Sequence, residues 1–133
     1  MSFFLRELGG RAARSLVLLG LTCLAVVCCS RSANSLAQCY AKAFASAPPE
    51  IKAVWDSATS AAKTNGYATA LLTFQALAKQ PKLTAAQLEA VQETSGALRA
   101  QMYEAAKQDD PQAQAAVEQL RRAFMESRGK RRP

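Results

Sequence analysis

Histidine is absent from all 133 residues, and with it the side chain that proteins use most often as a general base and as a metal ligand. Catalytic triads and zinc sites built on histidine are therefore excluded. A glycine-rich phosphate loop and a nucleophile motif of the Gly-x-Ser-x-Gly type are also missing. We therefore expect no enzymatic activity, no catalytic residues, no cofactor and no bound metal.

Strand patterns are equally scarce, because no run of β-branched residues alternates with polar ones over the length of a strand. Alanine is abundant in the body of the chain, and it favours helix over every other conformation. The sequence therefore predicts an all-α fold. Its N-terminal apolar segment is followed by a small bundle of about four amphipathic helices, arranged as two helical hairpins.

The segment 1–37 has the three parts of a secretory signal. Basic residues come first, an uncharged apolar run follows over residues 15–29, and a region of small residues ends near Ala37. The basic residues are Arg6, Arg11 and Arg14. This order predicts an exported protein, whether periplasmic, secreted or associated with the cell envelope.

Cleavage is predicted between Ala37 and Gln38, because Ser35 and Ala37 are small residues at the two positions that signal peptidases inspect. Ala33 and Ser35 offer an alternative pair. A helix over residues 15–29 would be roughly 22 Å long, short of a hydrocarbon core about 30 Å thick, which favours a signal over a membrane span.

Two other fates of this segment stay open. An uncleaved segment would anchor the chain in the membrane, with its positive flank toward the cytoplasm. Lipoprotein processing at Cys29 or Cys28 would attach a lipid instead, because these cysteines close the apolar run. Three of the four cysteines lie in this segment, so cleavage after Ala37 leaves Cys39 as a free thiol without an intrachain partner.

The formal net charge of +7 suggests a nucleic-acid-binding protein, but its distribution argues against one. Residues 1–37 carry a net +3 and residues 128–133 carry +4, whereas residues 38–127 hold nine basic and nine acidic side chains. We therefore expect no nucleic acid partner. The tail 128–133 is predicted to be disordered, and it offers possible contacts to an anionic lipid, a polyanion or an acidic protein through Arg128, Lys130, Arg131 and Arg132.

The body divides into a linker over residues 38–48 and a helical domain over residues 49–127. Helices are predicted at 49–64 and 67–80, separated by an Asn65-Gly66 turn with positive φ angles. A third helix begins at a capping box formed by Thr84 and Gln87. A fourth follows Asp109-Asp110-Pro111, which combines an Asp cap with proline at the first helical position, and extends to about residue 127.

Large apolar side chains should dominate the core, because each buried alanine removes little surface from water. In the third helix, a seam of positions 88, 91, 95, 98, 102 and 105 is expected to face inward, and Ser95-Gly96 should permit a kink or a close approach of helices. The residues expected to contribute most are Trp55, Phe74, Leu88, Leu98, Met102 and Phe124.

The stretch from Asn65-Gly66-Tyr67 through Ala70, Phe74 and Leu77 to Pro81 resembles the second half of a tetratricopeptide repeat. The chain also resembles small exported bacterial proteins of unknown function. The tetratricopeptide resemblance covers about 30 residues, and it implies peptide or protein binding in a concave groove without naming binding residues.

Taken together, the sequence predicts an exported helical protein that acts as a binding or structural module in the cell envelope. Its expected partner is another protein or a peptide, and membrane contact is expected only through the N-terminal segment. The alternative is an envelope protein that stays anchored by this segment or carries a lipid on Cys29 or Cys28.

Overall fold

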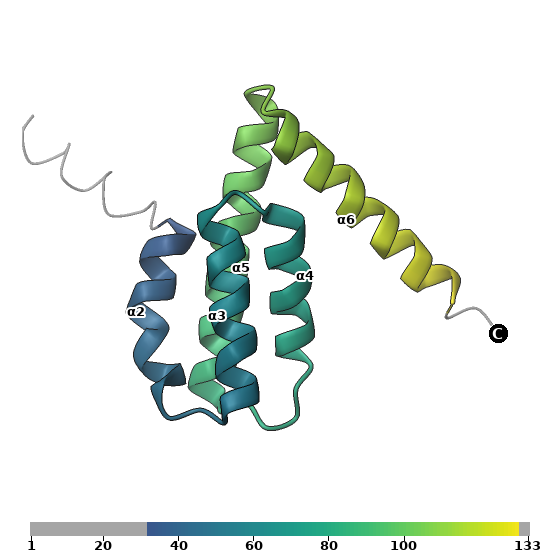
Figure 1. Ribbon diagram of the computed structural model, residues 1–133. Helices are drawn as coiled ribbons and strands as arrows, with labels where there is room; N and C mark the ends of the chain where they lie inside the picture. The colour runs from purple at the N-terminus through teal and green to yellow at the C-terminus, as the bar shows by residue number, and fades with distance from the viewer. Residues whose placement is uncertain (1–31, 131–133) are drawn as a thin grey trace, which may run out of the picture. The chain divides into compact units, whose positions relative to one another are not determined.

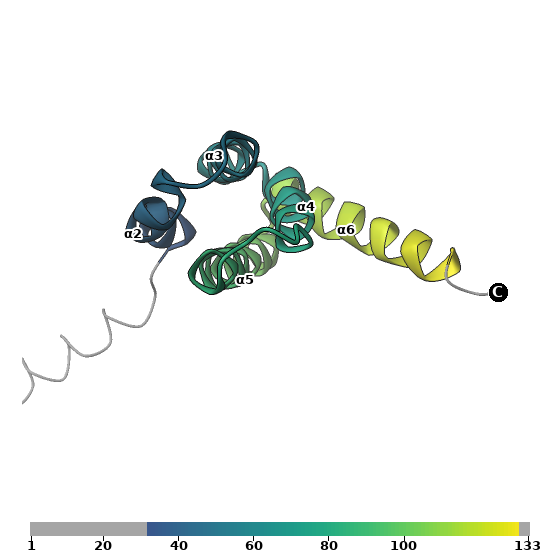
Figure 2. The same ribbon diagram turned by 90° about the horizontal axis from the view of Figure 1, so that it is seen from below.

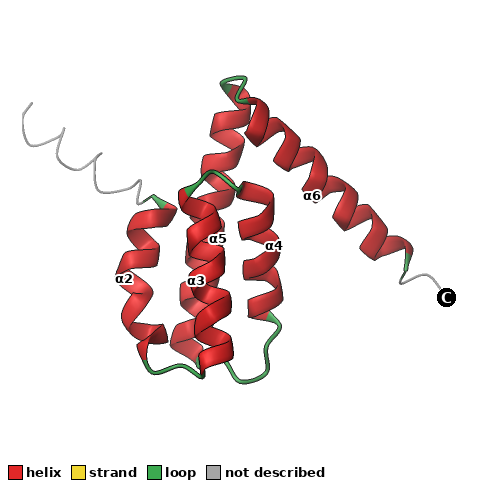
Figure 3. Ribbon diagram, in the orientation of Figure 1, coloured by secondary structure: helices red, strands yellow, loops and turns green. Residues whose placement is uncertain are grey.

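The computed structural model describes residues 32–130. The apolar part of the leader, Cys28, Cys29, Arg131 and Arg132 lie outside the described residues. Within this range there are only helices and no strands, as Figure 3 shows, which confirms the all-α prediction for this part of the chain. The helices are α2 (Ala33–Ala45), α3 (Pro49–Lys63), α4 (Tyr67–Ala78), α5 (Ala85–Lys107) and α6 (Pro111–Gly129).

Four of these helices, α2 to α5, form an up-and-down bundle around one core (Figures 1 and 2). Each helix contacts the next along the chain, and α5 closes the ring by also packing against α2. The fifth helix, α6, contacts α5 and α4 and then diverges from the bundle toward its C-terminal end (Figure 1). The predicted bundle is therefore present, but its members are not the four helices expected from the sequence.

The expected linker over residues 38–48 was wrong, because α2 covers Ala33–Ala45. The Ser32 hydroxyl caps this helix by accepting a hydrogen bond from the Ser35 N–H at 3.2 Å. Its buried residues recur at helical spacing on both sides of the predicted cleavage point between Ala37 and Gln38. They are Ala33, Leu36, Ala37 and Phe44. The helix was missed because the predicted leader and the predicted linker each contained only part of this apolar pattern.

The other helix starts agree with the sequence signals. The capping box is present at α5, with the Thr84 hydroxyl accepting from the Gln87 backbone N–H and the Gln87 side-chain Oε1 accepting from the Thr84 backbone N–H. Asp110 caps α6 by accepting from the Gln112 N–H at 2.9 Å, and Pro111 takes the first helical position. These signals are local, which is why the sequence alone located them.

Two helix ends close with a residue in the left-handed conformation, Asn65 after α3 (φ 57°) and Asp109 after α5 (φ 61°). At the first, the Gly66 N–H donates to the Ala61 carbonyl at 2.9 Å, and at the second the Asp110 N–H donates to the Ala105 carbonyl at 3.1 Å. Both are Schellman turns. The prediction of positive φ was correct for Asn65 but wrong for Gly66, whose φ is −74°.

Three aromatic rings from consecutive helices form the centre of the core. Phe44 of α2 stacks on Trp55 of α3 with ring centroids 4.1 Å apart, and Trp55 meets Phe74 of α4 edge-on at 5.6 Å. All three are buried. The predicted core positions Trp55, Phe74, Leu98 and Met102 are confirmed.

Two predicted core residues were wrong. Phe124 is 60% exposed, because only Ala113 and Ala116 of α6 are buried and the helix leaves the bundle after them. Leu88 is only partly buried, because the buried face of α5 is rotated from the predicted seam at the start of the helix and passes through Gln87 and Ala90 on either side of Leu88. That face includes two polar residues that the seam did not predict, Gln87 and Thr94.

The expected close approach at Gly96 is also wrong. Gly96 is exposed, and no atom lies within 4 Å of the position that a Cβ would take. The helix α5 continues through Ser95-Gly96 without a break.

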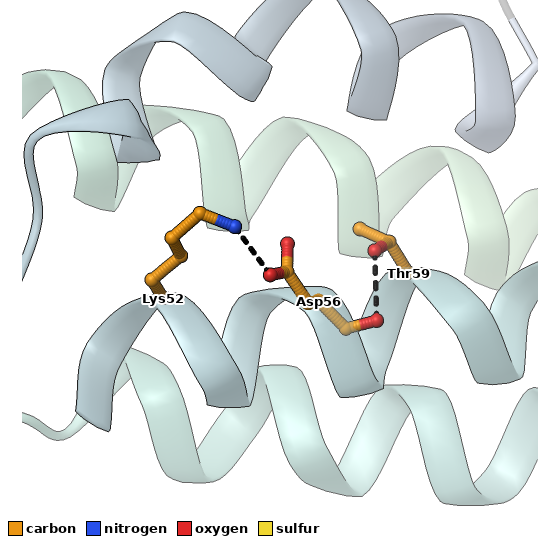
Figure 4. Close-up of polar contacts among 3 residues, drawn as sticks. All are labelled: Lys52, Asp56 and Thr59. Carbon is orange, nitrogen blue, oxygen red and sulfur yellow. Dashed lines mark hydrogen bonds and ion pairs between the residues drawn. The ribbon is translucent and has the colours of Figure 1, made fainter. Parts of the chain in front are cut away.

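Salt bridges contribute little to this fold. Figure 4 shows one on α3, where Lys52 pairs with Asp56 at 2.5 Å and the Thr59 hydroxyl donates to the Asp56 carbonyl. The Lys52 and Asp56 side chains are 48% and 56% exposed, so solvent screens the pair, and pairs of this kind add only about 0.3 to 0.5 kcal/mol. Stability therefore depends on the packed core and its few buried polar groups.

Gln87 is the polar group that joins α2 to α5. Its side-chain oxygen completes the capping box, and its Nε2 donates to the Ala43 carbonyl near the end of α2 at 2.9 Å. The Tyr40 hydroxyl adds a second link by donating to the Glu93 carboxylate at 2.6 Å. Gln87 is almost fully buried, so both ends of its amide have protein partners in place of water.

Replacing Gln87 with Glu tests this link, because the carboxylate keeps an acceptor for the Thr84 N–H but turns an oxygen toward the Ala43 carbonyl. We expect Gln87→Glu to lower the free energy of unfolding by about 1 to 2 kcal/mol in urea denaturation followed by circular dichroism. Thr84→Ala is the control, since it removes only the cap at a cost of about 1 kcal/mol. A Gln87→Glu variant as stable as the wild type would contradict the link.

Thr94 presents the opposite case, because its hydroxyl is fully buried in the core and has no hydrogen-bond partner within the described residues. An unpaired hydroxyl in an apolar core is destabilising, since it has lost its contacts with water.

We therefore expect Thr94→Val, which replaces the hydroxyl by a methyl group of similar size, to raise the free energy of unfolding by roughly 1 kcal/mol. Thr94→Ser keeps the hydroxyl and loses the methyl group, so it should lower stability by about 1 kcal/mol. Thermal melts of both variants provide the measurement. A Val variant that melts below the wild type would show that the hydroxyl has a partner.

Candidate functional site

A groove of about 710 Å³ lies where α6 diverges from the bundle. Residues of α4 and α5 line it together with residues of α6 from Val117 onward. The apolar lining consists mainly of Leu71, Leu72 and Phe74 from α4, Val91 from α5, and Val117, Leu120 and Phe124 from α6. Residues from three helices thus share one surface.

The apolar stripe of α6 becomes steadily more exposed along the helix. Ala113 is buried against the bundle, Val117 and Leu120 are partly buried, and Phe124 is 60% exposed. Met125, next to it, is 63% exposed. Large apolar side chains that remain uncovered beside a groove are typical of surfaces that bind another molecule.

Three cations line the groove as well: Lys79 at the C-cap of α4, Arg99 from α5 and Arg121 from α6. No Asp or Glu of the described range lines it. Arg121 has a neighbouring carboxylate, Glu118, at 3.6 Å, but both side chains are largely exposed and the pair is weak. The groove therefore combines an apolar surface with a net positive lining, although the body of the chain is neutral overall.

The predicted anion-contact residues lie close to this groove only in part. Arg128 belongs to α6, and its guanidinium carbon lies 5.6 Å from the centre of the Phe124 ring, in cation–π contact. Lys130 caps the end of α6, while Arg131 and Arg132 lie outside the described residues. The prediction of a disordered tail starting at residue 128 was wrong for residues 128 and 129, which are helical.

The predicted cleavage residues Ala37 and Gln38 lie in the middle of α2. Ala37 is buried, Gln38 is exposed, and Cys39 beside them is an exposed free thiol. Cleavage at this point and lipidation of Cys29 both stay predictions.

The sequence interpretation missed the groove because its cations are spread over three helices and 43 positions from Lys79 to Arg121. None of them forms a cluster in the sequence. One signal was present: the apolar stripe of α6 continues at helical spacing to Phe124, beyond the residues needed to pack against the bundle.

None of the helices in the described part of the chain is both long enough and apolar enough to span a membrane. Comparison with known proteins gave no match to a protein-family model, to a curated protein or to a solved structure.

The different environments of two phenylalanines give a direct test of this site. Phe74 is completely buried, so Phe74→Ala should lower the free energy of unfolding by about 3 to 5 kcal/mol. Phe124 is exposed, so Phe124→Ala should cost less than about 1 kcal/mol. Chemical denaturation of the two variants measures both values. A large loss at Phe124 would show that this ring belongs to the core and is not available to a partner.

Proposed function

We propose that this chain is an exported helical protein that acts by binding a partner protein in the groove between α4, α5 and α6. The observation that carries the proposal is the uncovered end of the α6 stripe at Phe124, beside Lys79 and Arg99, two cations that no carboxylate of the groove neutralises. The leader supports an envelope or secreted location, and a chain that stays anchored would present the same groove.

The chemistry of the groove favours an amphipathic helix with carboxylates along its flanks. Its apolar face would cover Leu120 and Phe124, and its carboxylates would meet Lys79 and Arg99. Complementary charge of this kind selects partners and speeds association.

Charge disfavours the occupants that the chain itself could supply. Residues 1–37 and 128–133 are both strongly basic, so either terminus would bring positive charge to a positive groove. The α6 helix of a second copy carries three arginines against two glutamates, so it too would bring a net positive charge toward these cations. A separate acidic partner avoids this repulsion.

The resemblance to a tetratricopeptide repeat points in the same direction. Repeats of this kind bind peptides in a concave groove, and the resembling stretch contains α4. Leu72, which lies in this stretch, lines the groove and is partly exposed there.

A synthetic 20-residue peptide provides the test, with leucines at helical spacing and glutamates flanking them. A second peptide keeps the leucines and replaces every glutamate with lysine. We expect fluorescence anisotropy to show binding of the acidic peptide and at least tenfold weaker binding of the basic one. Each glutamate that faces a groove cation should strengthen binding by roughly 0.5 to 1 kcal/mol, and each lysine in its place should weaken binding by a similar amount.

Variants of the protein then locate the binding surface. Phe124→Ala and Arg99→Glu should each weaken binding of the acidic peptide, the latter by roughly three- to tenfold. Arg122→Glu is the matched control, because Arg122 is exposed on α6 but does not line the groove. Equal binding of both peptides, or an equal effect of Arg122→Glu, would refute the proposal. So would binding of phosphatidylglycerol vesicles that depends on Arg99 in the absence of peptide binding.

A further inference from the structure

The first helix of the described range begins before the predicted cleavage point. Ser32 caps α2, and the helix runs without interruption from Ala33 to Ala45, with Ala37 and Gln38 in its second turn. From this geometry we infer that processing of the leader leaves α2 whole, so that the mature protein begins at or before Ser32. The inference concerns the N-terminus and does not depend on the groove.

The packing of α2 is the first reason. Ala33 is 1% exposed, Leu36 is 8% exposed and Ala37 is 7% exposed, in contact with the bundle. A cut after Ala37 would remove all three side chains and open the core between α2, α3 and α5, the two helices on which α2 packs. Secretory signals are discarded, so their residues have no reason to complete the core of the mature fold.

The new chain end is the second reason. After a cut at Ala37, the remaining helix would span only residues 38–45, and isolated helices this short are unstable in water. Its first residue would carry an α-ammonium group at the positive end of the helix dipole, where positive charge is unfavourable.

The loss would extend to the centre of the fold. The remaining part of α2 holds Phe44, which stacks on Trp55, and Ala43, whose carbonyl accepts the Gln87 side chain. Both contacts require this segment to stay helical and in register with α3 and α5.

These contacts discriminate between the fates of the leader. A cut after Ser35 also removes Ala33 and the Ser32 cap, so it is disfavoured for the same reasons. An uncleaved anchor and lipid attachment at Cys29 or Cys28 both keep α2 intact. So does cleavage between Ser30 and Arg31, where Cys28 and Ser30 are the small residues that signal peptidases require.

The surface position of Ser35 allows a test that leaves the fold unchanged. Ser35 is exposed on α2. It is also one of the small residues that signal peptidases inspect, because it is the third residue before a cut after Ala37 and the first residue before a cut after Ser35. Ser35→Gln places a large side chain at both positions and would block both cuts. Asn34→Gln is the matched control, because Asn34 is exposed in the same turn and signal peptidases do not inspect its position.

The full-length chain, with an affinity tag at its C-terminus, would be produced in a secretion-competent bacterial host and its N-terminus identified by intact-mass spectrometry. We expect the wild type, Ser35→Gln and Asn34→Gln to share one N-terminus at or before Ser32, with equal yields and equal melting temperatures. A wild-type chain that starts after Ser32 would overturn the inference. So would a Ser35→Gln chain that accumulates unprocessed while the wild type is cut. Neither outcome affects peptide binding in the groove, which is measured separately.

Discussion

The stack of Phe44 on Trp55, with Phe74 at the edge of the indole, is the contact on which the rest of the fold depends. Nearly half of the buried apolar residues are alanines, which let helix axes approach closely but each remove little surface from water. The three rings supply the bulk that the alanines lack, and they come from α2, α3 and α4. Because Phe44 belongs to α2, the bundle closes only when this helix is in place.

Local signals made most of the helices predictable from the sequence. Thr84 with Gln87, Asp110 with Pro111, and Asn65 each act through atoms within a few residues, so their effect can be read without a fold. Long-range packing could not be read in this way. The second role of Gln87, as a donor to Ala43, requires α2, and α2 was hidden because its apolar stripe crosses the point where a signal sequence is expected to end.

The groove illustrates why function was harder to predict than fold. In the sequence, these cations are hidden because residues 38–127 hold equal numbers of basic and acidic side chains. Only folding brings Lys79, Arg99 and Arg121 to one groove whose lining includes no Asp or Glu of the described range. The helix α6 plays two parts, since Ala113 and Ala116 complete the core while Phe124 lies uncovered. The apolar stripe of α6 thus holds the helix against the bundle at its N-terminal end and presents an apolar surface at its C-terminal end.

The left-handed conformation of Asp109 has a mechanical consequence. This residue joins α5 to α6, and Phe124 lies 15 positions further along, about 22 Å away at the rise of an α-helix. The helix is a lever arm, so each degree of rotation about this joint displaces the Phe124 ring by roughly 0.4 Å. The direction of α6, and with it the width of the groove, therefore depends on two features that do not line it: the backbone torsion of Asp109 and the packing of Ala113 and Ala116 on the bundle. A change of a few degrees there would resize the surface without altering any of its side chains.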